Sequence, residues 1–293
     1  MKTEMTGLWN YLEDQRGTAQ LTPSLILRAK SEGIEVSLDE ALNAIRRMSS
    51  RTGEVIAPRF VARLVAELLR AHNVKTVLDP WSYMPWDALQ VADALQSIER
   101  LDVASINGEA EVWSKAFGDS RVHVRIGKGW SSLQPERPTQ YDAIVSLGPI
   151  GMRESRTIRA TELSDDIGLL EMCSAAGQLS DEGIIAWLVP PRFAFDQSSK
   201  SVRQNLGKLG LYLTGWIQLP AGVLLPISSV PFAIAILQKK DFEQLYVVEA
   251  QANEESIPGL IQGLLKRKHR GRLANGILID RLNFYGCAAI QTQ

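Results

Sequence analysis

Four apolar runs in the middle of the chain end in residues whose types and places suggest a ligand cleft. These residues are Asp79-Pro80, Ser105, Gly127-Lys128 and Leu147-Gly148-Pro149-Ile150. In nucleotide-binding sheets, glycines after the first strand let the backbone approach the ligand, and an acid ending the second strand takes the ribose hydroxyls. Here Asp79 ends the first run. The second run ends 26 positions later (105 − 79 = 26) at Ser105, whose hydroxyl is a weaker acceptor than a carboxylate.

Strands that alternate with helices must position these residues. The strand-like runs are 75–79, 101–106, 122–126, 141–147, 183–189, 212–219 and 232–238. Helical patterns lie between the early ones, at 86–98, at 108–117 and around 162–179. This alternation predicts a parallel sheet with right-handed crossovers, and the near-continuous apolar character predicts strands covered on both faces. The last two runs are too close for a helical crossover and predict a closing antiparallel strand.

The two ends of the chain differ from this central part. Residues 37–47 predict a helix with a capping box from Ser37 to Glu40, and a second helix is predicted at Pro58–Ala71. Residues 254–272 predict a helix that ends in a basic cluster. We therefore expect an N-terminal helical segment at 1–52, a main domain at 53–240 and a helical, basic extension at 241–293. The final residues, RLNFYGCAAIQTQ, suggest that the chain is part of a longer protein.

Composition excludes several classes of protein. The formal net charge of −1 excludes a polycation that coats nucleic acid, so any such contact needs a local patch. Cys173 and Cys287 have no CxxC spacing, and with three scattered histidines a disulfide framework or a zinc site is not expected. No apolar run approaches the roughly 20 residues of a membrane span, and the N-terminus lacks a signal core. We expect a cytoplasmic protein.

Residues 53–240 contain three phrases that resemble one family. They are GEVIAPRFVARLVAELL at 53–69, YDAIVSLGPIG at 141–151 and WIQLPAGVLLPISSVPFAIAILQKK at 216–240. All three are similar to segments of type I restriction modification subunits and related N6-adenine DNA methylases. The resemblance implies an α/β fold of the S-adenosylmethionine-dependent methyltransferase-like (Rossmann-like) kind. It is a doubly wound sheet of seven strands, the last antiparallel, preceded here by the short helical region.

The loop after the first strand departs from the family's pattern. The family shows Asp-Pro-Ala-Cys-Gly-Ser-Gly-Gly, whereas this chain has DPWSYMPWD. Asp79 and Pro80 are retained, but Tyr83, Pro85 and Trp86 take the glycine positions. Proline removes a donor and fixes φ, and large aromatic side chains fill space that the cofactor would use. The resemblance therefore implies that S-adenosylmethionine does not bind here in the family's way.

Four further positions have lost the groups that the family uses. Ser105 stands for the ribose-binding acid, and Lys128 follows Gly127 where the family has an aspartate that accepts from adenine. The catalytic Asn-Pro-Pro-Phe, whose Asn side chain and a backbone carbonyl bind the adenine amino group, is replaced by Leu147-Gly148-Pro149-Ile150. The family's Thr-Pro is Ala57-Pro58. The degenerate cleft is thus expected at Pro58, Asp79, Pro80, Ser105 and Lys128.

Five losses at one cleft favour a pseudo-enzyme that needs no cofactor. The leading hypothesis is a non-catalytic DNA-binding or scaffold component of a DNA modification, restriction or phage-defence system. DNA, protein partners or a second copy of the chain are its expected partners, and a recognition module is expected after the extension. One alternative is an active, divergent adenine-N6 DNA methyltransferase that binds S-adenosylmethionine. Another is a cleft rebuilt for a different small ligand, which burial of Trp81 and Trp86 across the cleft would contradict.

Several residues also have plainer interpretations. Trp81, Tyr83 and Trp86 are expected to plug the emptied cleft, with a base-stacking platform as the alternative. Asp79 could instead cap the following helix. His123 and Cys173 are expected in the core, and Asp142 in a solvated turn. The basic cluster contains Lys266, Arg267, Lys268, His269, Arg270 and Arg272. It either complements the dipole of its helix or contacts phosphates, and the sequence leaves both open.

Overall fold

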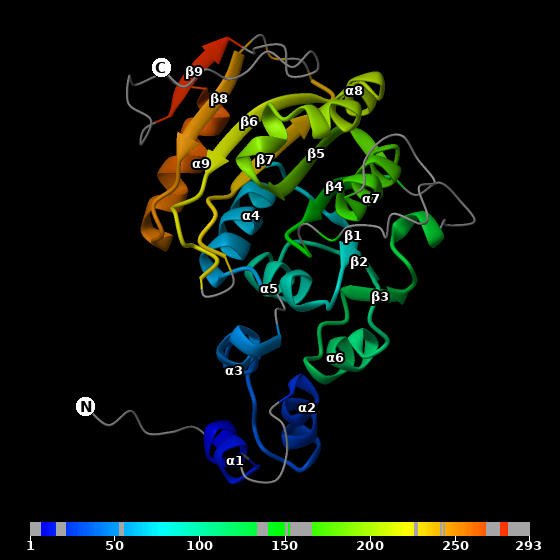
Figure 1. Ribbon diagram of the computed structural model, residues 1–293, viewed down its shortest axis with the longest axis vertical. Coiled ribbons are helices and arrows are strands. Elements are labelled where there is room, and N and C mark those ends of the chain that lie inside the picture. Colours follow the sequence, from blue (N-terminus) through cyan, green and yellow to red (C-terminus); the bar gives the residue numbers. More distant parts are fainter. Residues whose placement is uncertain are drawn as a thin grey trace.

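The computed structural model describes residues 7–15, 22–52, 56–133, 140–149, 152, 166–225, 228–240, 242, 244–267 and 276–280. Nine strands of this part form one mixed sheet in the order β3-β2-β1-β4-β5-β7-β6-β8-β9 (Figure 1). The strands are β1 Thr76–Ser82, β2 Arg100–Ser105, β3 Val122–Ile126, β4 Tyr141–Ser146, β5 Leu179–Val189, β6 Tyr212–Gln218, β7 Ala233–Gln238, β8 Gln244–Glu249 and β9 Ile277–Asp280. This is the predicted methyltransferase-like α/β sheet.

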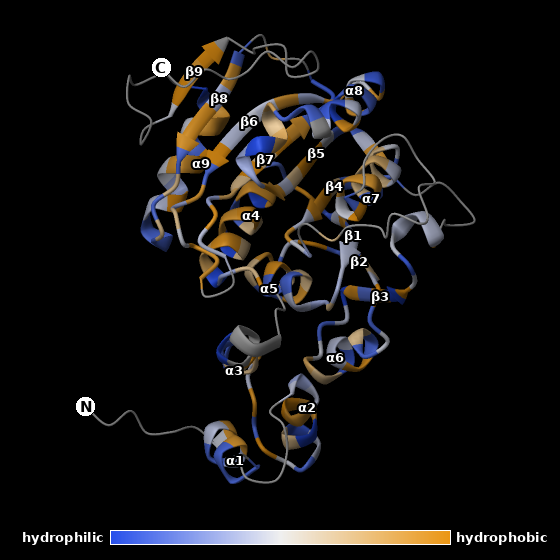
Figure 2. Cartoon of the chain, in the orientation of Figure 1, coloured by the Kyte–Doolittle hydropathy of each residue, from blue (hydrophilic) through white to orange (hydrophobic). Residues whose placement is uncertain are grey.

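Helices cover both faces of the sheet. On one face α4 (Arg59–Ala71), α5 (Trp86–Ala94) and α9 (Ile257–Lys266) share a hydrophobic core with the strands. On the other face α7 (Ile167–Ala176) and α8 (Lys200–Lys208) form a second core, and Cys173 lies in it as expected. The inner strands β1, β4, β5, β6 and β7 are largely apolar in Figure 2, because each contributes side chains to both cores.

The expected count of seven strands is wrong by two. β7 is antiparallel to β5 and β6, as the short connection predicted. The sheet then continues beyond β6, with β8 parallel to β6 and β9 antiparallel to β8. The sequence from 241 onward was expected to be helical, and its described part contains α9 but also these two strands. Because α9 packs against α4, the extension shares the core of the main domain.

The N-terminal segment consists of α1 (Gly7–Gln15), α2 (Pro23–Ser31) and α3 (Leu38–Thr52), which lie together at one end of the molecule (Figure 1). The predicted capping box forms, because the Glu40 carboxylate accepts from Ser37 N at 3.0 Å and Ser37 Oγ accepts from Glu40 N at 3.2 Å. The three helices share a third core with Ala110 and Trp113 of α6 (Ala110–Ala116).

Two sequence expectations fail along the strands. Asp142 was expected in a solvated turn, but its carboxylate accepts from the backbone N of Lys75 and of Thr76, each at 2.9 Å. It therefore fixes the start of β1 against β4. His123 was expected in the core, but it is exposed on β3, which is the edge strand of the sheet. An edge strand has a neighbour on one side only, so its side chains are less covered than those of an interior strand.

Candidate functional site

The order of strands places the switch point of the doubly wound sheet between β1 and β4. The chain proceeds from β1 outward to β2 and β3, and then returns to β4 on the other side of β1. Ligands in such sheets bind outside the carboxyl ends of the strands at this point. The loops that begin at Tyr83, Ile106, Gly127 and Leu147 all leave this edge, because β1 to β4 are parallel. The expected convergence of the four loops is confirmed.

Trp81 lies at the switch point. Its indole Nε1 donates a hydrogen bond of 3.2 Å to the carbonyl oxygen of Pro149, in the loop after β4. The side chain is only 3% exposed and lies against Gly168 at the start of α7. Within the expected catalytic loop, Leu147 is buried, Gly148 and Pro149 follow β4, and Ile150 lies outside the described residues. A backbone carbonyl of this loop is therefore occupied by a side chain of the same protein.

Asp79 lies inside β1 and not at its end. The strand continues through Pro80 and Trp81 to Ser82, so Asp79 cannot cap α5, as one interpretation had it. Asp79 is 5% exposed, and its carboxylate accepts a hydrogen bond of 3.3 Å from Trp81 N. Burial, and then the negative charge of Asp87, hold the pKa of Asp79 well above its ordinary value. The carboxyl group is thus kept away from solvent.

Asp87 is a residue of the candidate site that sequence reasoning missed. It lies in the first turn of α5, and its Oδ1 accepts from Ala57 N at 2.9 Å and from Gln90 Nε2 at 3.2 Å. Arg46 Nη2 donates to the carbonyl of Ala57 at 2.9 Å and to Gln90 Oε1 at 2.8 Å. Burial raises the pKa of Asp87 to about 6. This network fixes Ala57 and Pro58 at the start of α4 with groups of the chain itself.

Ser105 is also committed to internal contacts. It is completely buried at the end of β2, and its hydroxyl donates to the carbonyl oxygen of Tyr83 at 2.8 Å. The same Oγ accepts from the backbone N of Asn107 at 3.2 Å. The serine thus joins the loops after β1 and β2, in the place where an acid would bind ribose.

The loop after β3 folds onto α7. Glu171 of α7 is buried, and its carboxylate accepts from Ser131 N at 2.7 Å and from Ser131 Oγ at 2.6 Å. Gly129 has a φ of +112°, and a Cβ there would lie 2.4 Å from the carboxyl carbon of Glu171. Only glycine allows this approach. Lys128, by contrast, has an exposed side chain, while its backbone N donates to Ser132 Oγ at 2.8 Å.

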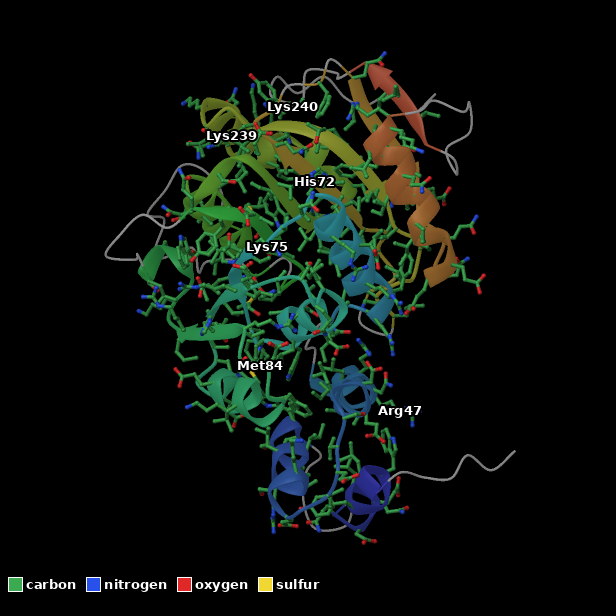
Figure 3. The ribbon with its side chains drawn as sticks, turned by 180° about the vertical axis from the view of Figure 1, so that it is seen from behind. Arg47, His72, Lys75, Met84, Lys239 and Lys240 are labelled. Atoms are coloured by element: carbon green, nitrogen blue, oxygen red, sulfur yellow. The ribbon has the colours of Figure 1, made fainter. Side chains whose placement is uncertain are left out.

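The three aromatic residues after Asp79 do not act as one plug. Trp86 packs with Met84 and Trp113 in the core of the N-terminal helices, and its ring meets that of Trp113 edge-on at 5.6 Å. Figure 3 shows Met84 beside α6, on the side of those helices. Tyr83 is 37% exposed. The positions of the family's glycines thus serve in part to dock the N-terminal segment.

The basic cluster begins at the opposite edge of the sheet from the cleft. Lys266 is exposed, but Arg267 is partly buried and donates from Nη1 to Thr214 O at 3.1 Å and from Nη2 to Gln244 O. Burial lowers the pKa of Arg267. The other predicted residues of the cluster, Lys268, Arg270 and Arg272, lie outside the described residues.

A pocket of about 270 Å³ lies elsewhere, between α3, α4 and α5. Arg59 lines it and pairs with Asp39 of α3 and, at 3.5 Å, with Glu254 before α9. None of the residues predicted for the cleft lines this pocket. Among the described residues no group of His, Cys, Asp and Glu could hold a metal ion. No helix of the described chain is long and apolar enough to cross a membrane.

The fold has close counterparts among solved structures. One is the methyltransferase subunit of a type I restriction-modification system from Streptococcus thermophilus, with a TM-score of 0.66 and 15% identity over 83% of this chain and 60% of that chain. A Listeria monocytogenes protein assigned to the class I S-adenosylmethionine-dependent methyltransferases also has a TM-score of 0.66, with 17% identity over 82% of this chain and 83% of that chain. The EcoKI M protein of a type I restriction enzyme has a TM-score of 0.54 and 12% identity over 87% of this chain and 63% of that chain.

These comparisons define the fold. The structural neighbours are type I restriction-modification methyltransferase subunits and class I methyltransferases, and at identities below 20% the likeness concerns the fold alone. The chain spans about three fifths of the length of the two type I subunits. It matches no model of a known protein family and no curated protein.

Proposed function

We propose that this chain is a methyltransferase-fold protein that has lost methyl transfer. In this proposal it is a non-catalytic DNA-binding or scaffold component of a DNA modification, restriction or phage-defence assembly. The observation that carries the proposal is the hydrogen bond from Trp81 Nε1 to Pro149 O across the switch point. A ligand at this point would have to displace a buried indole and break its hydrogen bond.

The residues around the switch point do not fit S-adenosylmethionine in the way the fold implies. The glycine-rich turn is replaced by a continuing strand through Ser82. The Ser105 hydroxyl is used by Tyr83, and the start of α4 is held by Asp87 through Ala57 N. Each group that would face the cofactor is therefore either missing or already hydrogen-bonded within the chain. We derive no catalytic step through the cofactor.

The structural neighbours suggest the setting. The Streptococcus thermophilus and EcoKI proteins are the methyltransferase and M subunits of type I restriction systems. By analogy, we place this chain in a DNA-modification assembly, with DNA and protein subunits or a second copy of itself as partners. This assignment rests on analogy between folds, so it needs its own test.

One observation favours the second candidate, an active and divergent adenine-N6 DNA methyltransferase. Asp79 and Pro80 remain at the switch point, and Asp79 keeps its carboxyl group there. The two candidates differ in methyl transfer. The full chain would be incubated with S-adenosylmethionine carrying a labelled methyl group and with mixed-sequence duplex DNA. Our proposal expects no label in the DNA, and label on adenine would establish the second candidate instead.

A further inference from the structure

Basic residues gather at the amino edge of the sheet, where the parallel strands begin. Because β7 runs antiparallel to its neighbours, Lys239 and Lys240 directly after it lie at this edge. Figure 3 shows the two lysines close together there, across the molecule from Met84 at the carboxyl edge. The end of α9 reaches the same edge, because Arg267 binds the carbonyl oxygens of Thr214 and Gln244 near the starts of β6 and β8.

Phe242 holds two of these cations against one ring. The guanidinium carbon of Arg267 lies 4.2 Å from the ring centroid, and Lys240 Nζ lies 5.4 Å from it. Because both cations contact the same ring, their like charges repel each other and are not fully screened at 0.1 M salt, where the Debye length is ~10 Å. An arrangement that concentrates positive charge in this way favours an anion between or above the two groups.

Within the described residues, no carboxylate forms an ion pair with Lys240 or Arg267, the two cations on the Phe242 ring. Lys239 is neutralised locally, since its Nζ lies 2.9 Å from both Asp181 Oδ1 and Leu179 O. Lys240 and Lys266 are exposed, and neither forms an ion pair with a carboxylate of the described chain. In the sequence, Asp241 and Glu243 flank Phe242 and reduce the net charge of this stretch.

We propose that Lys240 and Arg267, which share the ring of Phe242, and the exposed Lys266 beside Arg267 at the end of α9 contact the sugar-phosphate backbone of duplex DNA. The contact surface lies on the edge opposite the cleft that Trp81 closes. This inference deepens the proposed function and rests on it, because it assumes that the chain handles DNA. The Phe242 ring carries cations and so offers no stacking platform for a base. The contact therefore concerns phosphates and is independent of DNA sequence.

A DNA-binding experiment tests this surface. Fluorescence anisotropy measures binding to a fluorescein-labelled, mixed-sequence duplex of about 20 base pairs over a series of salt concentrations. The full chain is compared with the double variant Lys240→Gln/Lys266→Gln. A matched control, Lys115→Gln/Arg192→Gln, removes the same charge from exposed positions on α6 and after β5. Thermal unfolding followed by circular dichroism checks that each variant folds.

The logarithm of affinity falls with the logarithm of salt by about 0.9 for each phosphate contact. Loss of Lys240 and Lys266 is therefore expected to reduce that slope by about 2 and to weaken binding roughly 10- to 100-fold at 0.1 M salt. The control is expected to keep the slope. An unchanged slope for the amino-edge variant, with a reduced slope for the control, would overturn the inference. Absence of any duplex binding at low salt would also overturn it, while the loss of methyl transfer would still stand on the labelling experiment.

Discussion

The indole nitrogen of Trp81, on β1, lies 3.2 Å from the carbonyl oxygen of Pro149 in the loop after β4. This one hydrogen bond joins the two strands between which ligands bind in doubly wound sheets. The resemblance to adenine methylases implies that a backbone carbonyl of that loop would accept a hydrogen bond from the target base. Here such a carbonyl already has a donor from the chain itself, and our proposal of a closed cleft rests on this contact.

Replacement of Trp81 by phenylalanine should lower the free energy of unfolding by about 1–2 kcal/mol. The change keeps an aromatic ring but leaves the partly buried Pro149 carbonyl without its donor. The matched control is Trp86→Phe. Trp86 is as buried as Trp81, but its Nε1 has no partner among the described residues, so its loss should cost less. Urea unfolding measures both, and equal losses would show that the Trp81 hydrogen bond contributes little.

Replacement of Ser105 tests whether the second strand could still take an acid. Ser105→Ala should cost about 1 kcal/mol, because the Tyr83 carbonyl and the Asn107 N–H lose a partner. Ser105→Asp should cost several kcal/mol, because it places a carboxylate at a position with 0% exposure. A Ser105→Asp variant that is as stable as the wild type and gains S-adenosylmethionine binding would contradict the closed-cleft account.

The stability of the protein should depend on the ionisation of Asp87. Its pKa is about 6 in the folded protein, above the ordinary value of 3.8, so the folded state binds more protons between these two values. Stability from this group is present below pH 4 and is lost as the pH rises through 6, by up to about 3 kcal/mol. Asp79 acts in the same direction, because its pKa is also raised.

Asp87→Asn isolates this contribution. The amide oxygen can still accept from Ala57 N, but the side chain no longer ionises beside Asp79. Urea unfolding from pH 4 to pH 8 should show a smaller fall in stability for the variant than for the wild type. The contribution assigned to Asp87 would be refuted if the two fall in parallel.

Glu171 should determine the order of the loop after β3. Glu171→Ala leaves Ser131 N and Oγ without their acceptor, and should cost about 2–3 kcal/mol because charge-assisted hydrogen bonds are lost. Amide hydrogen exchange of residues 128–133 should become faster, while exchange in β6 and β7 is unchanged. Unchanged exchange in the loop would show that the Trp130 core contacts hold it without Glu171.

The general architecture could be predicted from sequence because its signals are local. Apolar runs and helical periodicity placed strands β1 to β7 and helices α5, α6 and α7 to within a few residues, whereas α8 between β5 and β6 was not predicted. The Ser37–Glu40 capping box could be recognised from four residues. β8 and β9 were missed because their pairing depends on a strand already in the sheet. Short strands carry little pattern of their own, and β9, at the edge of the sheet, has only four residues.

The candidate site could be located but its contacts could not. The four loops were expected at one edge, and the structure brings them there. Asp87 gave no distinct signal, since an acid in the first turn of a helix is common for reasons of the helix dipole. The division of Trp81 and Trp86 between two environments depends on the N-terminal helices, which lie against Trp86 only in the folded protein.

Calorimetric titration of S-adenosylmethionine, and then of S-adenosylhomocysteine, into the full chain tests the central claim most directly. At protein concentrations near ~100 μM, a Kd of about 10⁻⁵ M corresponds to roughly −7 kcal/mol and would be visible. An active class I methyltransferase titrated under the same conditions checks the ligands. The account predicts no saturable heat for either ligand, because the indole of Trp81 occupies the switch point. Saturable binding at micromolar concentrations would contradict it and would favour an active, divergent enzyme.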